Sequence, residues 1–115
     1  MTVLEAYDAA VAAYGNLVTK FGVYVEASSY DGKKDFGKWL AALDKATKEV
    51  EAAYADSKDK TATLEKTLDD YLKANRDKIK DDKAKKEAVD AVDEAIRSMT
   101  EGLKEIRKHL DEYKT

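Results

Sequence analysis

The sequence predicts an all-α protein, an antiparallel bundle of four helices in a single domain over residues 1–115. Two observations carry this prediction. The chain contains no proline and only five glycines, which favours helices over turn-rich β structure. Large apolar residues also recur at alternating steps of three and four along most of the chain, which is the spacing of one helix face.

The first helix is expected over residues 2–27. Thr2 is a good N-cap, and Glu5 stands three residues later, which is the spacing of a capping box. The strongest apolar row of this helix alternates an aromatic residue with leucine or valine, and we expect it to face the core. This row consists of Leu4, Tyr7, Val11, Tyr14, Val18, Phe21 and Val25.

The first helix is also unusually poor in charge, with only four charged residues between positions 2 and 27. A helix that is apolar around most of its circumference needs burial on more than one side. The helix is therefore either central in the bundle or part of an interface. We expect a second, exposed row to form an interface, and its residues are Val3, Ala10, Leu17 and Tyr24. Gly15 and Gly22, seven residues apart, indicate a place where another helix comes close.

A loop is expected over residues 28–35, where serines and the pair Asp31-Gly32 occur and large aliphatic residues are absent. Asp35 is expected to cap the next helix. The apolar row resumes at Phe36 and predicts helices over 35–56 and 60–76.

The break between these two helices is ambiguous. Residues 55–63 hold no large apolar residue, so a turn there would remove little apolar surface from the core. They also lack glycine and proline, and the heptad spacing passes through them. The alternative is therefore three helices with one long middle helix over 35–76.

The last helix is expected over residues 82–114. Asn75 suits a helix end, and Asp81 and Asp82 suit a new cap. The apolar row of this helix consists of Val89, Val92, Ile96, Met99, Leu103, Ile106, Leu110 and Tyr113.

No residue pattern indicates catalysis or a metal site. The chain has no cysteine, which excludes disulfides and thiolate ligands. His109 is the only histidine, and Glu105 precedes it by four residues, whereas di-iron bundles use Glu-x-x-His. The remaining carboxylates are interleaved with lysines, which is typical of solvated helix faces. We expect no enzyme, no catalytic residue, no cofactor and no metal.

The sequence therefore predicts a non-enzymatic protein–protein interaction module, such as an adaptor, inhibitor, immunity or assembly factor, that uses its apolar, tyrosine-rich first helix. The partner would be another protein or a second copy, with a homodimer as the simplest case. The alternative is an amphipathic-helix binder of lipid or other hydrophobic surfaces, although narrow apolar rows favour helix partners over a membrane.

The net charge and the targeting patterns limit which other partners and which cellular location we expect. The net charge of −3 is too small to indicate nucleic-acid binding. No signal peptide or transmembrane segment is recognised, so we expect a cytoplasmic protein, with leaderless secretion left open.

Overall fold

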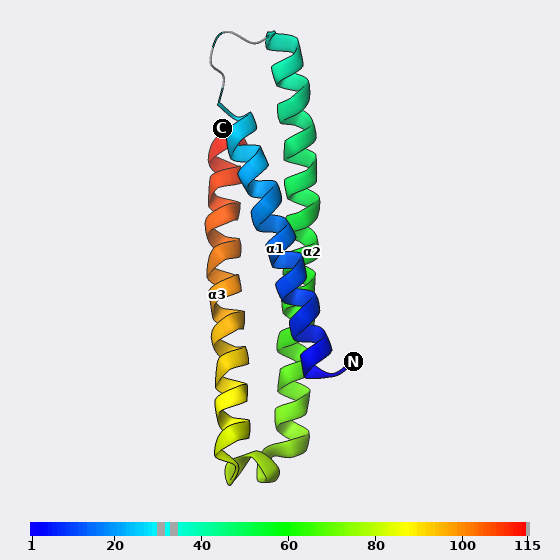
Figure 1. Ribbon diagram of the computed structural model, residues 1–115, viewed down its shortest axis with the longest axis vertical. Coiled ribbons are helices and arrows are strands. Elements are labelled where there is room, and N and C mark those ends of the chain that lie inside the picture. Colours follow the sequence, from blue (N-terminus) through cyan, green and yellow to red (C-terminus); the bar gives the residue numbers. More distant parts are fainter. Residues whose placement is uncertain (30–31, 33–34, 115) are drawn as a thin grey trace.

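The computed structural model of the chain describes residues 1–29, 32 and 35–114. For residues 113 and 114 it describes the backbone alone. The described residues form three helices: α1 (Val3–Ala27), α2 (Phe36–Lys80) and α3 (Lys83–Lys114). In Figure 1, α1 and α3 run in one direction and α2 runs in the opposite direction. Together they form a rod with principal extents of 63 × 21 × 20 Å.

The four-helix prediction is wrong, and the three-helix alternative fits, because α2 continues without a break through residues 55–63. This stretch lacks large apolar residues, but it is still buried on one side. Ser57 and Thr61 lie inside the bundle, and the Thr61 hydroxyl donates a hydrogen bond of 2.8 Å to the Ser57 carbonyl oxygen. Small side chains are sufficient here because α1 packs closely against α2.

The far end of α2 lies close to the place where the sequence indicated a helix end. Asn75 has non-helical dihedral angles (φ −121°, ψ 19°), and its side-chain amide donates to the Tyr71 carbonyl oxygen. This kink bends the helix but does not end it, and α2 continues to Lys80. Asp82 then caps α3, since its carboxylate accepts a hydrogen bond from the Lys85 backbone N–H.

The predicted caps of the first two helices are confirmed. Thr2 and Glu5 form a reciprocal capping box, and the Asp35 carboxylate accepts from the Lys38 N–H. Hydrogen bonding to the side chain and the backbone of Thr2 holds the pKa of Glu5 below its ordinary value. Because that pKa is lowered by folding, the stabilisation from this cap is present at neutral pH and is lost as pH falls through it. Tyr30, Asp31, Lys33 and Lys34 of the expected loop lie outside the described residues, while Gly32 has a φ of 77° that favours glycine.

The core consists of two apolar clusters placed one above the other along the rod. The cluster near the α1 C-terminus contains Leu17, Tyr24, Ala46, Val50, Ala53, Leu103, Ile106 and Leu110. The cluster near the α1 N-terminus contains Ala6, Ala10, Leu64, Leu68, Ile96 and Met99. The expected row of α3 supplies both clusters, as predicted, although the Tyr113 side chain lies outside the described residues.

Tyr14 joins the two clusters and sets the distance between α1 and α3. Its side chain packs against both clusters, and its ring lies directly over Gly102 of α3. A Cβ atom at Gly102 would overlap the Tyr14 hydroxyl and would lie 2.8 Å from Cζ of the same ring. Only a residue without a side chain allows this approach.

The register of α1 differs from the expected one. The buried residues of α1 are Ala6, Ala10, Ala13, Leu17 and Tyr24. Leu4, Val11, Val18 and Val25 of the row that was expected in the core are exposed, and the aromatic residues of that row are half-buried. Three of the five buried residues are alanines, which allow this face of α1 to pack closely against α2, and Leu17 and Tyr24 are its two large buried side chains.

The register can be tested with two neighbouring lysine substitutions. Leu17 is 0% exposed and Val18 is 48% exposed. We expect Leu17→Lys to lower the free energy of unfolding by more than about 3 kcal/mol, because it removes a buried leucine and buries a charge. Val18→Lys should change it by less than about 0.5 kcal/mol, as surface substitutions usually do. Urea denaturation followed by circular dichroism measures both, and similar losses would contradict this register.

The contact between Tyr14 and Gly102 can be tested by a double-mutant cycle. Gly102→Ala should destabilise the wild-type protein by about 1–2 kcal/mol, since overpacking outweighs the better helix propensity of alanine. In a Tyr14→Ala background the same change should stabilise by up to about 1 kcal/mol. Gly22→Ala is the matched control, because a Cβ there meets nothing within 4 Å and should be stabilising in both backgrounds.

Candidate protein-binding surface

The residues predicted to form an exposed interface lie inside the bundle. Ala10, Leu17 and Tyr24 are buried in the two core clusters, and Val3 is half-buried beside the N-terminal one. The expected exposure of this row is therefore wrong. It is the row by which α1 packs against α2 and α3 within the chain.

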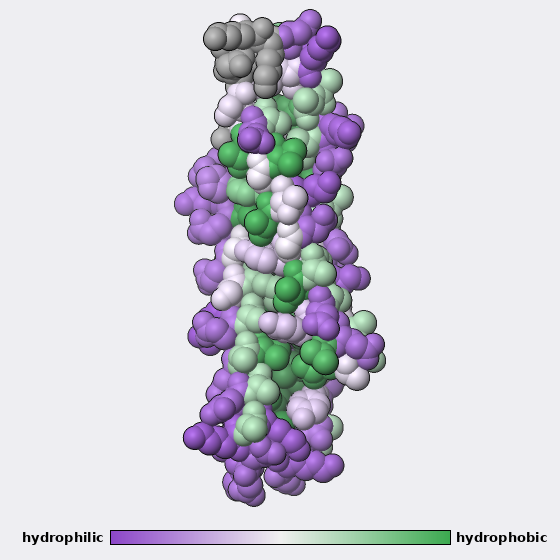
Figure 2. All heavy atoms as spheres, in the orientation of Figure 1, coloured by the Kyte–Doolittle hydropathy of each residue, from purple (hydrophilic) through white to green (hydrophobic). Residues whose placement is uncertain are grey.

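A different apolar row of α1 is exposed, and we call Leu4, Val11, Val18 and Val25 the outer row. Its members are spaced by seven residues, so they line one side of the helix from its first turn to its last. Figure 2 shows this face, where apolar side chains run along the middle of the rod between hydrophilic margins. The sequence predicted these residues in the core, because they belong to the strongest apolar row of the helix.

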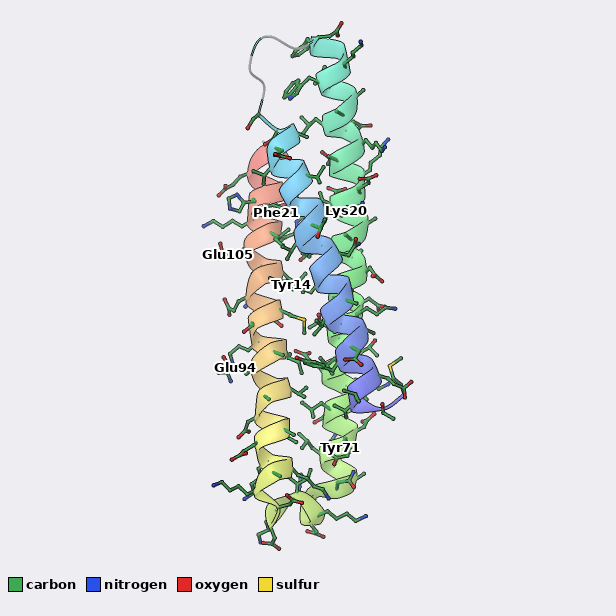
Figure 3. All side chains as sticks on the ribbon, in the orientation of Figure 1. Tyr14, Lys20, Phe21, Tyr71, Glu94 and Glu105 are labelled. Atoms are coloured by element: carbon green, nitrogen blue, oxygen red, sulfur yellow. The ribbon has the colours of Figure 1, made fainter. Side chains whose placement is uncertain are left out.

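The surface around the outer row is uncharged over most of its length. Between Asp8 and Glu26 the only charged residue of α1 is Lys20. Its ammonium group lies 3.7 Å from a carboxylate oxygen of Glu49 in α2, which holds it at the side of the helix (Figure 3). The 17 residues between Asp8 and Glu26 correspond to about 25 Å of helix without a charge on the outer side.

Gly15 and Gly22 lie beside the outer row on the exposed side of α1. A Cβ atom at either position would meet nothing within 4 Å, and neither residue has a positive φ. The close approach of another helix that they indicate is therefore not made within the described part of this chain. Each glycine lowers helix stability by about 1 kcal/mol relative to alanine.

A groove opens at the N-terminal end of the outer row. In Figure 1, α1 crosses the bundle obliquely, with its C-terminal end beside α3 and its N-terminal end over α2. The groove is lined by the start of α1, by the first turns of α3 including Lys85, and by Leu68 and Tyr71 of α2, and has a volume of about 490 Å³. Leu4 and Tyr7 line it from α1, and Ala88 and Ala91 line it from α3.

The edge of α3 that borders α1 is defined by two contacts. Tyr14 lies over Gly102, and the Phe21 ring lies 5.7 Å from the His109 ring, centroid to centroid. Both contacts join residues 88 positions apart, so α1 and α3 lie parallel with a constant offset. Figure 3 shows Glu94 and Glu105 pointing into solvent from the side of α3 that is turned away from α1.

The described residues contain no group of three or more histidine, cysteine, aspartate or glutamate residues placed to hold a metal ion. The Ser57 hydroxyl is buried without a hydrogen-bond partner among them, but it lies between the helices in the middle of the core. No helix in the described ranges has the length and apolar character needed to cross a membrane.

Comparison of the chain with models of known protein families, with curated proteins and with solved structures finds no match.

Proposed function

We propose that this protein is a non-enzymatic interaction module that binds a helix of another protein along the outer row of α1. The observation that carries this proposal is the row itself, in which four large apolar residues are exposed at seven-residue spacing on an uncharged helix face. Contiguous apolar patches on a soluble domain are typical of interaction sites. Helix recognition uses anchors at this kind of spacing.

The shape of the surface supports a helical partner. The outer row extends from Leu4 to Val25, about 32 Å along the helix axis, which a partner helix of about 20 residues would match. Gly15 and Gly22 leave open space beside the row, so the backbone of a partner could approach α1 closely there. The groove at the N-terminal end would accept a bulky apolar side chain, as the central residues of protein interfaces commonly do.

Two valines of α1 provide a matched test of this proposal. Val18 belongs to the outer row, and Val23 lies on another side of the helix with nearly the same exposed fraction, 48% against 47%. A photo-crosslinking amino acid placed at position 18 in cells of the source organism should form protein adducts, and one at position 23 should not. Equal adduct formation at both positions, or none at either, would contradict the proposal.

The same pair predicts how lysine substitutions act on the interaction. Val18→Lys should remove the partner adduct formed from a second probe at position 11, because it places a charge in the middle of the apolar row. Val23→Lys should leave that adduct unchanged. Circular dichroism checks that both variants remain helical. An adduct with twice the mass of the chain would identify the partner as a second copy.

A further inference from the structure

We infer that the groove at the N-terminal end of the outer row binds a fatty acid, with the acyl chain in the groove and the carboxylate beside Lys85. This inference goes beyond the proposed function and does not depend on it, because it uses the groove and the start of α3 and not a partner of the outer row. Two observations carry it, the size and lining of the groove and the unusual charges in the first turn of α3.

The groove has the size and the lining of a site for a small apolar ligand. Its volume of about 490 Å³ falls within the range of ligand sites in proteins, which also form between the helices of bundles. Apolar side chains from all three helices line it, among them Val3, Leu68 and Val92. On α3 the lining extends from Lys85 to Val92, about 10 Å along the helix axis, which gives room for an extended acyl chain.

The groove carries a single charge in its lining. Among the described residues that line it, Lys85 is the only charged one. The Lys85 ammonium group lies 3.9 Å from a carboxylate oxygen of Asp82, and 49% of its side chain is exposed. The other oxygen of that carboxylate accepts a hydrogen bond from the Lys85 backbone N–H and caps α3. The ammonium group therefore remains accessible to a second anion.

The first turn of α3 has charges that do not stabilise a helix. The N-terminus of a helix carries a partial positive charge and favours acidic side chains. In this turn no residue is acidic, and Lys83, Lys85 and Lys86 are all exposed lysines. Their charges oppose the helix dipole, so helix stability does not account for them. An anion bound beside Lys85 would be attracted by these lysines and by the helix N-terminus together.

The apolar groove and the lysines meet at one end of the rod. In Figure 2 the apolar side chains of this face end above a hydrophilic surface, which Figure 1 identifies as the connection between α2 and α3. A fatty acid has the same arrangement, because its apolar chain ends in one carboxylate. A neutral apolar ligand would leave the lysines without a role. An alkyl amine would bring its positive charge against Lys85 and the start of the helix, which opposes binding.

The test uses three ligands with the same alkyl chain, namely octanoate, octanol and octylamine. Titration of the whole protein with each ligand, followed by nuclear magnetic resonance, measures the affinity and locates the ligand. We expect octanoate to shift the amide signals of Ala88 and Ala91 and to bind at least about threefold more tightly than octylamine at low ionic strength. High salt should reduce this difference, because it screens the charges. Equal affinity for octanoate and octylamine, or no binding of octanoate, would overturn the inference.

Two lysine substitutions test the position of the carboxylate. Lys85→Gln should weaken octanoate binding about three- to tenfold and leave octanol binding unchanged, since the alcohol carries no charge. Lys48→Gln is the matched control, because Lys48 also pairs with an aspartate, 3.1 Å from Asp44. It lies 20 residues before Leu68 in α2, about 30 Å from the groove, and should have no effect on either ligand. Equal weakening of octanoate binding by both variants would mean that net charge alone acts, which would overturn the inference.

Two alanine substitutions test the position of the acyl chain. Ala84 and Ala88 are both exposed in the first turns of α3, but of the two only Ala88 lines the groove. Ala88→Phe should fill the groove and reduce binding of octanoate and octanol at least about tenfold, because the acyl chain loses its apolar contacts. Ala84→Phe should leave both affinities unchanged, and circular dichroism checks that both variants stay helical. Octanoate binding that survives Ala88→Phe would overturn the inference.

The remaining outcomes separate the fatty acid from other occupants and from the proposed function. Val18→Lys should leave octanoate binding unchanged, because Val18 does not line the groove. Octanoate binding lost in Val18→Lys would place the ligand on the outer row and overturn the inference. Co-sedimentation with phosphatidylglycerol vesicles that is lost in Lys85→Gln would assign the lysines to a membrane surface and would also overturn it. None of these results alters the adducts expected from position 18, so the proposed function is tested separately.

Discussion

The close contact between α1 and α2 is the constraint on which the rest of this structure depends. It is formed by small residues on both helices, the buried alanines of α1 and Ala53, Ser57 and Thr61 of α2. Small side chains bring two helix axes together, and the dense packing that results replaces the large apolar residues that are missing from this part of α2. One long helix can therefore stay buried through a stretch that looks polar in the sequence.

The same contact explains why α1 exposes its larger apolar residues. Since the alanine row faces α2, the aromatic residues Tyr7, Tyr14 and Phe21 lie at the side of the helix and fill the space toward α3. The next row around the helix, from Leu4 to Val25, then has no partner within the described part of the chain and faces solvent. The proposed binding surface is therefore a consequence of how α1 packs.

The middle of the bundle carries a polar layer that separates the two apolar clusters. Ser57 and Thr61 are both buried there, and only the Thr61 hydroxyl has a hydrogen-bond partner among the described residues. A buried hydroxyl without a partner costs about 1–3 kcal/mol. Tyr14 spans this layer and contacts both clusters, and its contact with Gly102 fixes the position of α1 along α3. Sliding either helix by a turn would place the ring against a side chain and not against a glycine.

The sequence by itself determined the local features of this protein. Capping residues predict the helix starts at Thr2 and Asp35 and the cap at Asp82, and a single dominant apolar row predicts the buried face of α3. Neither signal depends on neighbouring helices. Tertiary structure alone decided whether residues 55–63 form a turn and which of two apolar rows of α1 is buried. Hydrophobicity ranks valine and leucine above alanine, but the distance between two helices decides which side chains fit between them. That distance depends on both helices at once, so the candidate site was assigned to Ala10 and Leu17 when the exposed residues are Val11 and Val18.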